Sequence, residues 1–496
     1  MSRCALLVAG SAVVLTAACG TTVPVQSQVS SAAADGLGVT QSGQPSQVAS
    51  ASAAPVLGTG SDPGSVSVPL PGQPATVPGA PTTAAGPVVK AGTSKVTTPL
   101  SIGSMVAGNV GAANNAIGRS SGAAYDQQDA AKAVISALNA SGGLAGRRIS
   151  AVTSVIDPTS SNYDTQASAA CANFTQDHHV SIAMSFDASF YSEPFSACIA
   201  KHQIPEITLL DGGAGAATLA KHPLMFSPMA PTAERRFKAA VTGLTGNGFL
   251  ASKNKVGLVV EGCAQDQTAA DKVIEPMLKA KGITVMRRDV TCVRGFGDAA
   301  GFIGAVQATV LPLRSAGVDR VMFVSGFEQV AVQFFEKQAS AQGWKPSYAV
   351  TSAAGTGYND VQLNDEQLSR IQGVGWHPTK DVTVLPADNP AVKRCRGLLK
   401  SYPPAFDRTT ISAAFPICEA FFFLEAGLLR TAGHSEADVL ASGLRGLGSG
   451  FLSPTALGGA TLFSAQRKDG PQLFATMGFV AGCSCFRYTS SPQPWG

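Results

Sequence analysis

Apolar residues follow two alternating spacings between residues 99 and 352. Short runs of consecutive apolar residues, typical of buried parallel strands, are each followed by a stretch in which apolar side chains recur every three or four positions. Ala130, Ala131, Val134 and Leu138 show the second spacing, which predicts a helix covered on one side. Repeated strand and helix pairs predict an α/β fold with parallel sheets covered on both faces.

The alternation forms two series that divide near Pro231, so we predict two doubly wound parallel-sheet lobes joined by a hinge. A long helix over 411–431 and two more strand-like runs, 460–463 and 473–481, follow the second series. The strands predicted before these are 99–104, 149–156, 180–184, 206–210, 255–260, 283–289, 320–324 and 347–351. The predicted helices are 122–140, 164–177, 192–202, 232–244, 265–281, 298–316 and 329–342.

The N-terminal residues have the organisation of an export signal. One basic residue, Arg3, precedes an apolar run over 5–17 that is shorter than the ~20 residues of a membrane span, and the run ends in Ala17-Ala18-Cys19. This pattern resembles a bacterial lipoprotein signal, which implies a signal peptide over 1–18, lipidation of Cys19 and attachment to the extracytoplasmic face of the cell membrane. The alternative is an ordinary secretory signal with a chance cysteine, because Thr16 stands where an aliphatic residue is usual.

Residues 19–98 form a separate segment of low complexity. Ala, Gly, Ser, Thr, Pro, Val and Gln dominate it, and no aromatic residue occurs before Tyr125. Such a composition buries too little apolar surface to fold, so we predict a disordered tether.

The charge balance of the chain limits the classes of partner. The formal net charge is +4, and no Lys/Arg run exceeds two residues, so no nucleic-acid partner is expected. The best later candidate for a membrane span, 411–429, is interrupted by Pro416 and Glu419. Membrane contact is therefore expected through the lipid anchor.

Ten cysteines occur in the sequence, and eight remain when Cys4 is removed with the signal and Cys19 is lipidated. An even number in an exported chain indicates disulfides, although eight thiols allow ~105 pairings. Proximity along the chain suggests Cys171 with Cys198, Cys263 with Cys292, and Cys395 with Cys418, and it leaves Cys483 and Cys485 over. A metal site is the competing interpretation, but the chain has no CxxC spacing, and we expect neither a metal nor a cofactor.

A run of short motifs carries a family resemblance. The clearest is the turn Asn139-Ala140-Ser141-Gly142-Gly143-Leu144-Ala145-Gly146-Arg147, which joins the first helix to the second strand. With later echoes, the chain resembles the type I periplasmic binding proteins over about 99–485, in particular the branched-chain amino-acid binding family of ABC importers. The echoes are Ile204-Pro205, Gly317-Val318-Asp319, Lys337-Gln338-Ala339 and Lys468-Asp469-Gly470.

The resemblance implies lobes assembled from discontinuous sequence and joined by three crossings. The first lobe would comprise 99–230 plus 376–457, and the second 231–375 plus 458–496. The implied function is capture of a small polar ligand, such as an amino acid, an amide or a related carboxylate, between the lobes for delivery to an ABC permease.

The resemblance also implies ligand residues in the loops that follow the strands of the first lobe. Ser189 matches the serine with which relatives hold the ligand carboxylate, and Asp187 and Ser192 lie in the same loop. Ser189 and Ser192 could equally cap the helix that follows. In the next loop, beside Asp211, Gly212 takes the place of a threonine that holds the carboxylate in relatives.

The second lobe would contribute Gln265, Asp266, Phe327, Glu328 and Ser352. A glutamate that clamps the ligand ammonium in amino-acid binders is missing near Ser352. Its replacement could be one of four acids, each of which could instead be a helix cap or a solvated loop acid. These are Asp187, Asp211, Asp266 and Glu328.

Three function classes remain open at this point. A ligand sensor or envelope-interaction protein could use the same fold without transport. An exported hydrolase is the less favoured alternative, because HExxH is absent and none of the six histidines has an obvious nucleophile partner in sequence. Gly213-x-Gly215 half-matches a dinucleotide fingerprint but lacks the third glycine, so no nucleotide is expected.

Overall fold

The computed structural model describes residues 96, 98–108, 111, 115, 127–186, 190–358, 362–400 and 408–495, without the side chains of 358 and 408–413. All of these residues belong to the unit Gly79–Gly496. The predicted signal peptide, Cys19 and most of the predicted tether lie outside the described residues.

The first sheet has five parallel strands in the order β2-β1-β3-β4-β5. Strands β1 and β3, in its middle, contain no charged residue. The first strand, β1, pairs with β2 along its whole length, from Leu100 opposite Ile149 to Ala107 opposite Ile156. The strands are β1 Leu100–Ala107, β2 Ile149–Ile156, β3 Ile182–Ser185, β4 Glu206–Thr208 and β5 Met225–Phe226.

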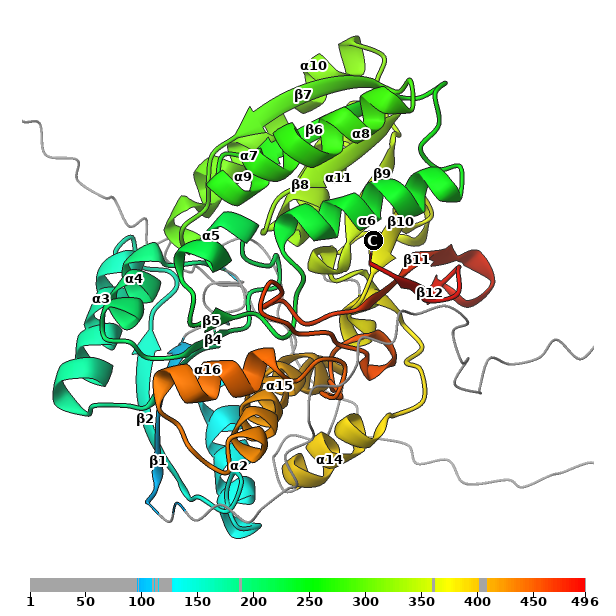
Figure 1. Ribbon diagram of the computed structural model, residues 1–496. Helices are drawn as coiled ribbons and strands as arrows, with labels where there is room; N and C mark the ends of the chain where they lie inside the picture. Colours follow the sequence, from blue (N-terminus) through cyan, green and yellow to red (C-terminus); the bar gives the residue numbers. More distant parts are fainter. Residues whose placement is uncertain are drawn as a thin grey trace, which may run out of the picture. The chain divides into compact units, whose positions relative to one another are not determined.

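Helices from two distant parts of the chain cover this sheet. In Figure 1 the helix α15 lies beside the cyan α2, and the orange α16 packs on α15. The apolar faces of these helices share one core with β1, β3 and β4. The first lobe, as we use the term, is this sheet with its helices. They are α2 Gln127–Ala140, α3 Tyr163–Ala172, α4 Glu193–Lys201, α5 Ala216–Lys221, α14 Pro390–Leu399, α15 Arg408–Arg430 and α16 Ala437–Arg445.

The second sheet has eight strands, and most of it is parallel, in the order β12-β11-β10-β9-β8-β6-β7 with β13 paired to β11. Strands β11 and β12 run antiparallel to their neighbours, and they bring the red C-terminal segment of Figure 1 against β10. The strands are β6 Lys255–Glu261, β7 Thr284–Val290, β8 Arg320–Val324, β9 Ser347–Thr351, β10 Ile371–Gly375, β11 Leu473–Val480, β12 Cys485–Tyr488 and β13 Gln493–Pro494.

This sheet and its helices form the second lobe. The predicted helix over 265–281 is interrupted by a widened turn, Ala270–Ile274, because Pro276 lies at the start of α8 and cannot donate a backbone hydrogen bond. The helices are α6 Ala233–Gly246, α7 Ala264–Ala269, α8 Glu275–Ala280, α9 Ala299–Ala308, α10 Val310–Ser315, α11 Glu328–Ala341, α12 Asp365–Leu368 and α13 Pro378–Asp381.

One strand prediction was wrong, and strands β5, β10, β12 and β13 were not predicted. Residues 460–463 form only isolated bridges, one of them to Pro471, which has no N–H to extend a ladder. Strand β10 was missed because two of its five residues are glycine. Gly373 is needed there, since a Cβ would lie 2.7 Å from the carbonyl oxygen of Val350.

The chain crosses between the lobes near Pro231, and the later segment Lys468-Asp469-Gly470 clasps this crossing. The N–H of Thr232 donates to Asp469 Oδ2 at 2.7 Å, and Arg235 forms an ion pair with the same carboxylate. Backbone bonds from Ser227 to Lys468 and from Gly470 to Ser227, each 2.9 Å long, complete the clasp. The crossing near Pro231 is thereby held against the later segment of the chain at 468–470.

The turn after α2 contains glycines that the backbone geometry requires. Gly143 has φ = 82°, and a Cβ there would lie 1.9 Å from the carbonyl oxygen of Arg147. The Asn139 side chain accepts from the Ile149 N–H at 2.7 Å and donates to the Ile149 carbonyl at 3.0 Å. The motif therefore fixes how β2 begins.

All three predicted disulfides are present, and a fourth joins the leftover cysteines. The bonded pairs are Cys171–Cys198, Cys263–Cys292, Cys395–Cys418 and Cys483–Cys485. The first three span 27, 29 and 23 positions. Loops of this size are each worth about 3 kcal/mol of stability in the chain-entropy account.

One helical segment, Phe296–Ser315, is long and apolar enough to span a membrane by length and composition alone. Its side chains Phe302, Val306, Val310 and Leu313 are fully buried in the core that also holds β8. Core helices of soluble proteins pass the same test, so this segment is weak evidence for a membrane span.

Candidate binding site

Loops at the carboxyl ends of the two sheets touch each other. Gly212, in the loop after β4, approaches Gly326, in the loop after β8, so closely that a Cβ on Gly212 would lie 2.7 Å from the Gly326 Cα. A Cβ on Gly215 would likewise lie 2.9 Å from the Gln265 Cβ. Ligands of open parallel sheets bind at these strand ends, and the missing side chains let the two lobes meet there.

The side chain at this meeting point is Arg236. Thr232 caps α6, and Arg236 lies in its first turn on the same stripe as Ala233, Phe237 and Ala240, so the helix buries it completely. Its Nη1 would lie 3.3 Å from a Cβ on Gly212. The guanidinium thus lies beside a loop of the first lobe although its helix belongs to the second.

Arg236 is incompletely paired. Its Nη2 donates to the Ser325 carbonyl at 3.3 Å and to Asp266 Oδ1 at 3.4 Å. Its Nε and Nη1 have no protein partner, and neither does Asp266 Oδ2. Buried polar atoms without partners are costly, so this pair offers donors and an acceptor to a bound group.

Two further acids surround the same guanidinium. Glu261 accepts from Ser325 Oγ at 2.6 Å and from the Val293 N–H at 2.8 Å. Glu328 accepts from the Thr351 N–H at 2.9 Å and from the Thr351 hydroxyl. We call Arg236, Glu261, Asp266 and Glu328 the charged centre.

Burial disfavours the ionised form of each acid in the charged centre. It raises the pKa of Glu261 and brings the pKa of Glu328 to about 7. For Asp266, burial and then the Glu261 carboxylate raise the pKa well above its usual range. Three acids share one cation, so the centre has an excess of acid that protons or a cationic group can neutralise.

A second ion pair lies between Asp211, after β4, and Lys380 of α13. Asp211 Oδ1 is buried and has no protein partner. Both residues line a gap with Ser352 and Trp376 that is too narrow for a water molecule. The backbone N–H of Trp376 donates to Ser352 Oγ at 2.9 Å, so this hydroxyl holds the segment that leads into α13.

Aromatic side chains that follow other strands, β2, β3 and β7, also close the junction, together with Phe327 after β8. Phe190 of the first lobe packs on Phe296 and Phe327 of the second, with ring centroids 5.1 and 5.7 Å apart, and on Tyr163 at 5.7 Å. The Phe296 N–H donates across the junction to the Pro158 carbonyl at 2.9 Å. We call Tyr163, Phe190, Phe296 and Phe327 the aromatic rim. A polar hollow of about 290 Å³ adjoins it, lined by residues 160–165, Arg294, Gly295, Gly297 and Asp298.

The structure brings together several of the predicted ligand residues. Gly212, Asp266 and Glu328 contact or surround Arg236, Phe327 belongs to the aromatic rim, and Gln265 lies beside Gly215. Asp211 and Ser352 line one narrow gap. Asp187 and Ser189 lie outside the described residues.

Ser192 takes the capping role that the sequence left open. Its Oγ accepts from the Phe195 N–H at 3.4 Å at the start of α4, and it donates to Asp164 Oδ1 at 2.9 Å. Arg236, Glu261 and Lys380 were missed by sequence reasoning. The available signal was an arginine on the apolar stripe of a predicted helix.

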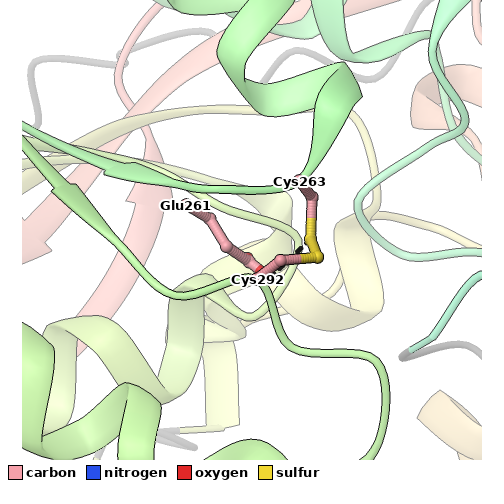
Figure 2. A group of neighbouring side chains, drawn as sticks. All are labelled: Glu261, Cys263 and Cys292. Carbon is pink, nitrogen blue, oxygen red and sulfur yellow. Dashed lines mark hydrogen bonds between the residues drawn. A yellow bond between two sulfur atoms is a disulfide. The ribbon is translucent and has the colours of Figure 1, made fainter. Parts of the chain in front are cut away.

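Glu261 also lies beside a disulfide, as Figure 2 shows. Its Oε1 is 3.1 Å from Cys263 Sγ, and Glu261, Cys263 and Cys292 form the one group among the described residues whose atoms are close enough to hold a metal ion. Both sulfurs are engaged in the Cys263–Cys292 bond. Because thiolates are the ligands that metals prefer, this oxidised pair is a poor metal site.

A family model described as periplasmic binding protein matches residues 109–478. The chain belongs to this family. No curated protein sequence matches the chain. This family agrees with the predicted one. The two mainly parallel sheets of the chain agree with the predicted fold.

Solved structures share the fold of this periplasmic binding protein at low sequence identity. A solute-binding protein of an ABC transporter from Rhodopseudomonas palustris HaA2, in complex with p-hydroxybenzoic acid, has a TM-score of 0.58 at 14% identity, covering 80% of this chain and 97% of its own. The isoleucine complex of LivJ from Streptococcus pneumoniae has a TM-score of 0.56 at 15% identity, with 80% and 99% covered. The leucine-binding protein LivK of Thermotoga maritima has a TM-score of 0.56 at 12% identity, with 80% and 99% covered.

Proposed function

We propose that this protein captures a small carboxylate-bearing solute between its two lobes and delivers it to an ABC permease. The observation that carries the proposal is the buried Arg236, whose Nε and Nη1 lack partners where Gly212 meets Gly326. A guanidinium in this state matches the two oxygens of a carboxylate. Isoleucine and p-hydroxybenzoic acid, the ligands named for two of the similar structures, both carry a carboxylate.

The remaining contacts in the proposal come from both lobes. Asp266 Oδ2 and Asp211 Oδ1 are the unpaired acceptors that an ammonium, amide or hydroxyl group of the ligand would use. Ser189 and Asp187 would approach from the loop after β3, with Ser192 fixing its end. Gly212 would let the two loops close beside Arg236, and the lining would be completed by Gln265, Phe327, Glu328 and Ser352.

The excess of acid in the charged centre supports a ligand that also carries a cationic or donor group. A zwitterion supplies a carboxylate for Arg236 and an ammonium for Asp266, so its two charges replace the loose contact of 3.4 Å between those side chains. Ligand entry requires the aromatic rim to separate, which is the hinge motion of two-lobed binding proteins.

The N-terminal segment completes the proposal. A lipid on Cys19 and a tether over 19–98 would hold the lobes at the extracytoplasmic face of the cell membrane, within reach of a permease. A tether of this length has a root-mean-square reach of about 50 Å. Loss of membrane association in Cys19→Ala, measured by fractionation of cells, tests this part.

Thermal unfolding of the purified protein with matched pairs of solutes tests the binding function. The pairs are isoleucine against isoleucinamide and 4-hydroxybenzoate against 4-hydroxybenzamide, with glucose as a solute of another class. At 100 times its dissociation constant a ligand adds about 2.7 kcal/mol, a shift of several degrees for a small domain and about half as much for a larger one. We expect a shift from an acid and none from its amide. Shifts from glucose alone, or equal shifts from acid and amide, would contradict the proposal.

Ligand sensing without transport is the second candidate function. The aromatic rim favours it, because the lobes already make an apolar contact that needs no ligand. Uptake of the radiolabelled solute that gives a thermal shift, compared between cells with and without the protein, separates the two functions. Transport predicts reduced uptake in the deletion strain, and sensing predicts unchanged uptake.

A further inference from the structure

The fourth disulfide differs from the other three in the loop it closes. Cys483 and Cys485 are separated by two positions, whereas the other pairs span 23 to 29. A disulfide stabilises the fold according to the loop entropy it removes, and folding stabilises the disulfide by the same amount. The native structure therefore protects the three long-range bonds against reduction and gives the Cys483–Cys485 bond little such protection.

The two sulfurs of this pair are unequally accessible. Cys483 is exposed in the turn between β11 and β12, whereas Cys485 is 2% exposed and begins β12. Thiol–disulfide exchange proceeds by attack of a thiolate on one sulfur, and access decides which sulfur is attacked. An approaching thiolate reaches Cys483, so Cys485 is the leaving group.

The surroundings favour departure of Cys485. The guanidinium of Arg487 lies with Nε 3.4 Å from Cys485 Sγ, where it stabilises negative charge on the released sulfur. Ser484, between the cysteines, has φ = 45° and ψ = 46°, a left-handed conformation that a residue with a side chain adopts at a cost. Opening the disulfide frees this residue to leave that conformation.

The hairpin that carries the pair is anchored independently of the bond. Phe486 packs on Phe479 with ring centroids 5.7 Å apart, and its backbone N–H donates to Thr383 Oγ1 at 3.0 Å. The Thr383 N–H donates in return to the Phe486 carbonyl at 2.9 Å. The pair can therefore open and close on a frame that stays in place.

We propose that Cys483–Cys485 is a redox-active disulfide that oxidises dithiols of exported proteins. A thiolate of the dithiol attacks Cys483 Sγ, a mixed disulfide forms, and the electron pair of the broken bond leaves on Cys485 Sγ. The second thiolate of the dithiol then attacks its own mixed-disulfide sulfur and releases Cys483. One disulfide and two thiols become two thiols and one disulfide, and a low-molecular-weight disulfide such as oxidised glutathione restores the pair.

Titration of the purified full chain with glutathione buffers tests the redox property. After equilibration, free thiols are alkylated and located by peptide mass spectrometry. We expect Cys483 and Cys485 to be half reduced at a ratio of reduced to oxidised glutathione roughly 100-fold less reducing than the other pairs require, since those bonds carry the loop stabilisation. Reduction of Cys263–Cys292 at the same or a less reducing ratio would overturn the proposal.

Oxidation of a dithiol peptide by the full chain tests the activity. The double variant Cys483→Ser, Cys485→Ser should lose it while retaining the wild-type unfolding temperature within a few degrees. Arg487→Gln should slow the exchange about three- to fivefold, the range of an exposed charge contact, and Arg487→Lys should restore most of the rate. Unchanged peptide oxidation by the double variant would show that another disulfide is responsible and would overturn the assignment.

Discussion

The aromatic rim and the charged centre lie at the same junction but close it in opposite ways. At the rim, Phe190 meets Phe296 and Phe327, and each contact is complete without a ligand. At the centre, Arg236 and Asp266 are equally buried yet retain unpaired donors and an acceptor. Apolar contact stabilises closure whatever is bound, whereas unpaired charge favours closure around a matching solute. The aromatic rim therefore determines how firmly the lobes close, and the charged centre determines which solute they select.

Removing the rim should have the largest effect. Phe190→Ala should lower the free energy of unfolding by about 3 kcal/mol, because a buried ring with three aromatic neighbours is replaced by a cavity. Urea unfolding measures the loss. Small-angle X-ray scattering without ligand should show a larger radius of gyration. Phe190→Leu, the control, should keep most of the stability, and equal losses in both variants would mean that aromatic packing is not the cause.

Removing the cation should affect binding next most strongly. Arg236→Met should lower the affinity for the carboxylate solute that gives a thermal shift. The expected loss is about 100-fold, the value of two charge-assisted hydrogen bonds. Isothermal titration calorimetry measures the change, with circular dichroism to confirm folding. Lys238→Met, an exposed neighbour on α6, is the matched control. Unchanged affinity in Arg236→Met would place the ligand elsewhere.

The pH dependence of stability is the next difference between the two regions, because the aromatic rim has no carboxyl group and the charged centre has three. The pKa of Glu328 is raised to about 7, so Glu328 is protonated in both states well below pH 4.5 and ionised in both above 7. Its contribution to stability is thus fully present at low pH and is lost as pH rises through about 7. Glu328→Gln should reduce the fall in unfolding free energy between pH 5 and 8 by on the order of 2 kcal/mol.

Urea unfolding at the two pH values measures this difference. The Gln side chain can still pair with Thr351, so the variant should fold. Glu366→Gln, at an exposed position, is the control and should leave the wild-type pH dependence in place. A fall in the Glu328→Gln variant as large as in the wild type would mean that Glu328 does not titrate in this range.

The smallest effect concerns a residue beside the rim. Ser192→Ala should lower the free energy of unfolding by about 1 kcal/mol, because the Phe195 N–H loses its capping oxygen. Ligand affinity should stay within twofold of the wild type, and Ser192→Asn should recover most of the stability. A tenfold loss of affinity would instead make Ser192 part of the binding surface.

Sequence reasoning predicted the fold well, because parallel strands and covered helices leave periodic patterns. It also paired Cys171, Cys263 and Cys395 with the correct partners, since each partner lies within about one strand and helix along the chain. Strand β10 was missed because Gly373 and Gly375 remove the apolar run, although close packing requires them.

The candidate site was predictable only in part. Asp266 and Glu328 could be named as candidates because they follow strands, where ligand loops occur. Arg236 was missed because its importance comes from Gly212, 24 positions earlier and in the other lobe, which no local pattern connects to it. A buried charge depends on its tertiary neighbours, and those are set by how the two sheets meet.

The clasp between Thr232 and Asp469 has a consequence for biogenesis. Its partners lie 237 positions apart, so a ribosome adds Asp469 long after it has added Thr232. A chain still in transit can assemble the first sheet but cannot fasten its crossings. The hinge between the lobes therefore becomes fixed only after synthesis has passed Asp469, when all the parallel strands of both sheets have already been made.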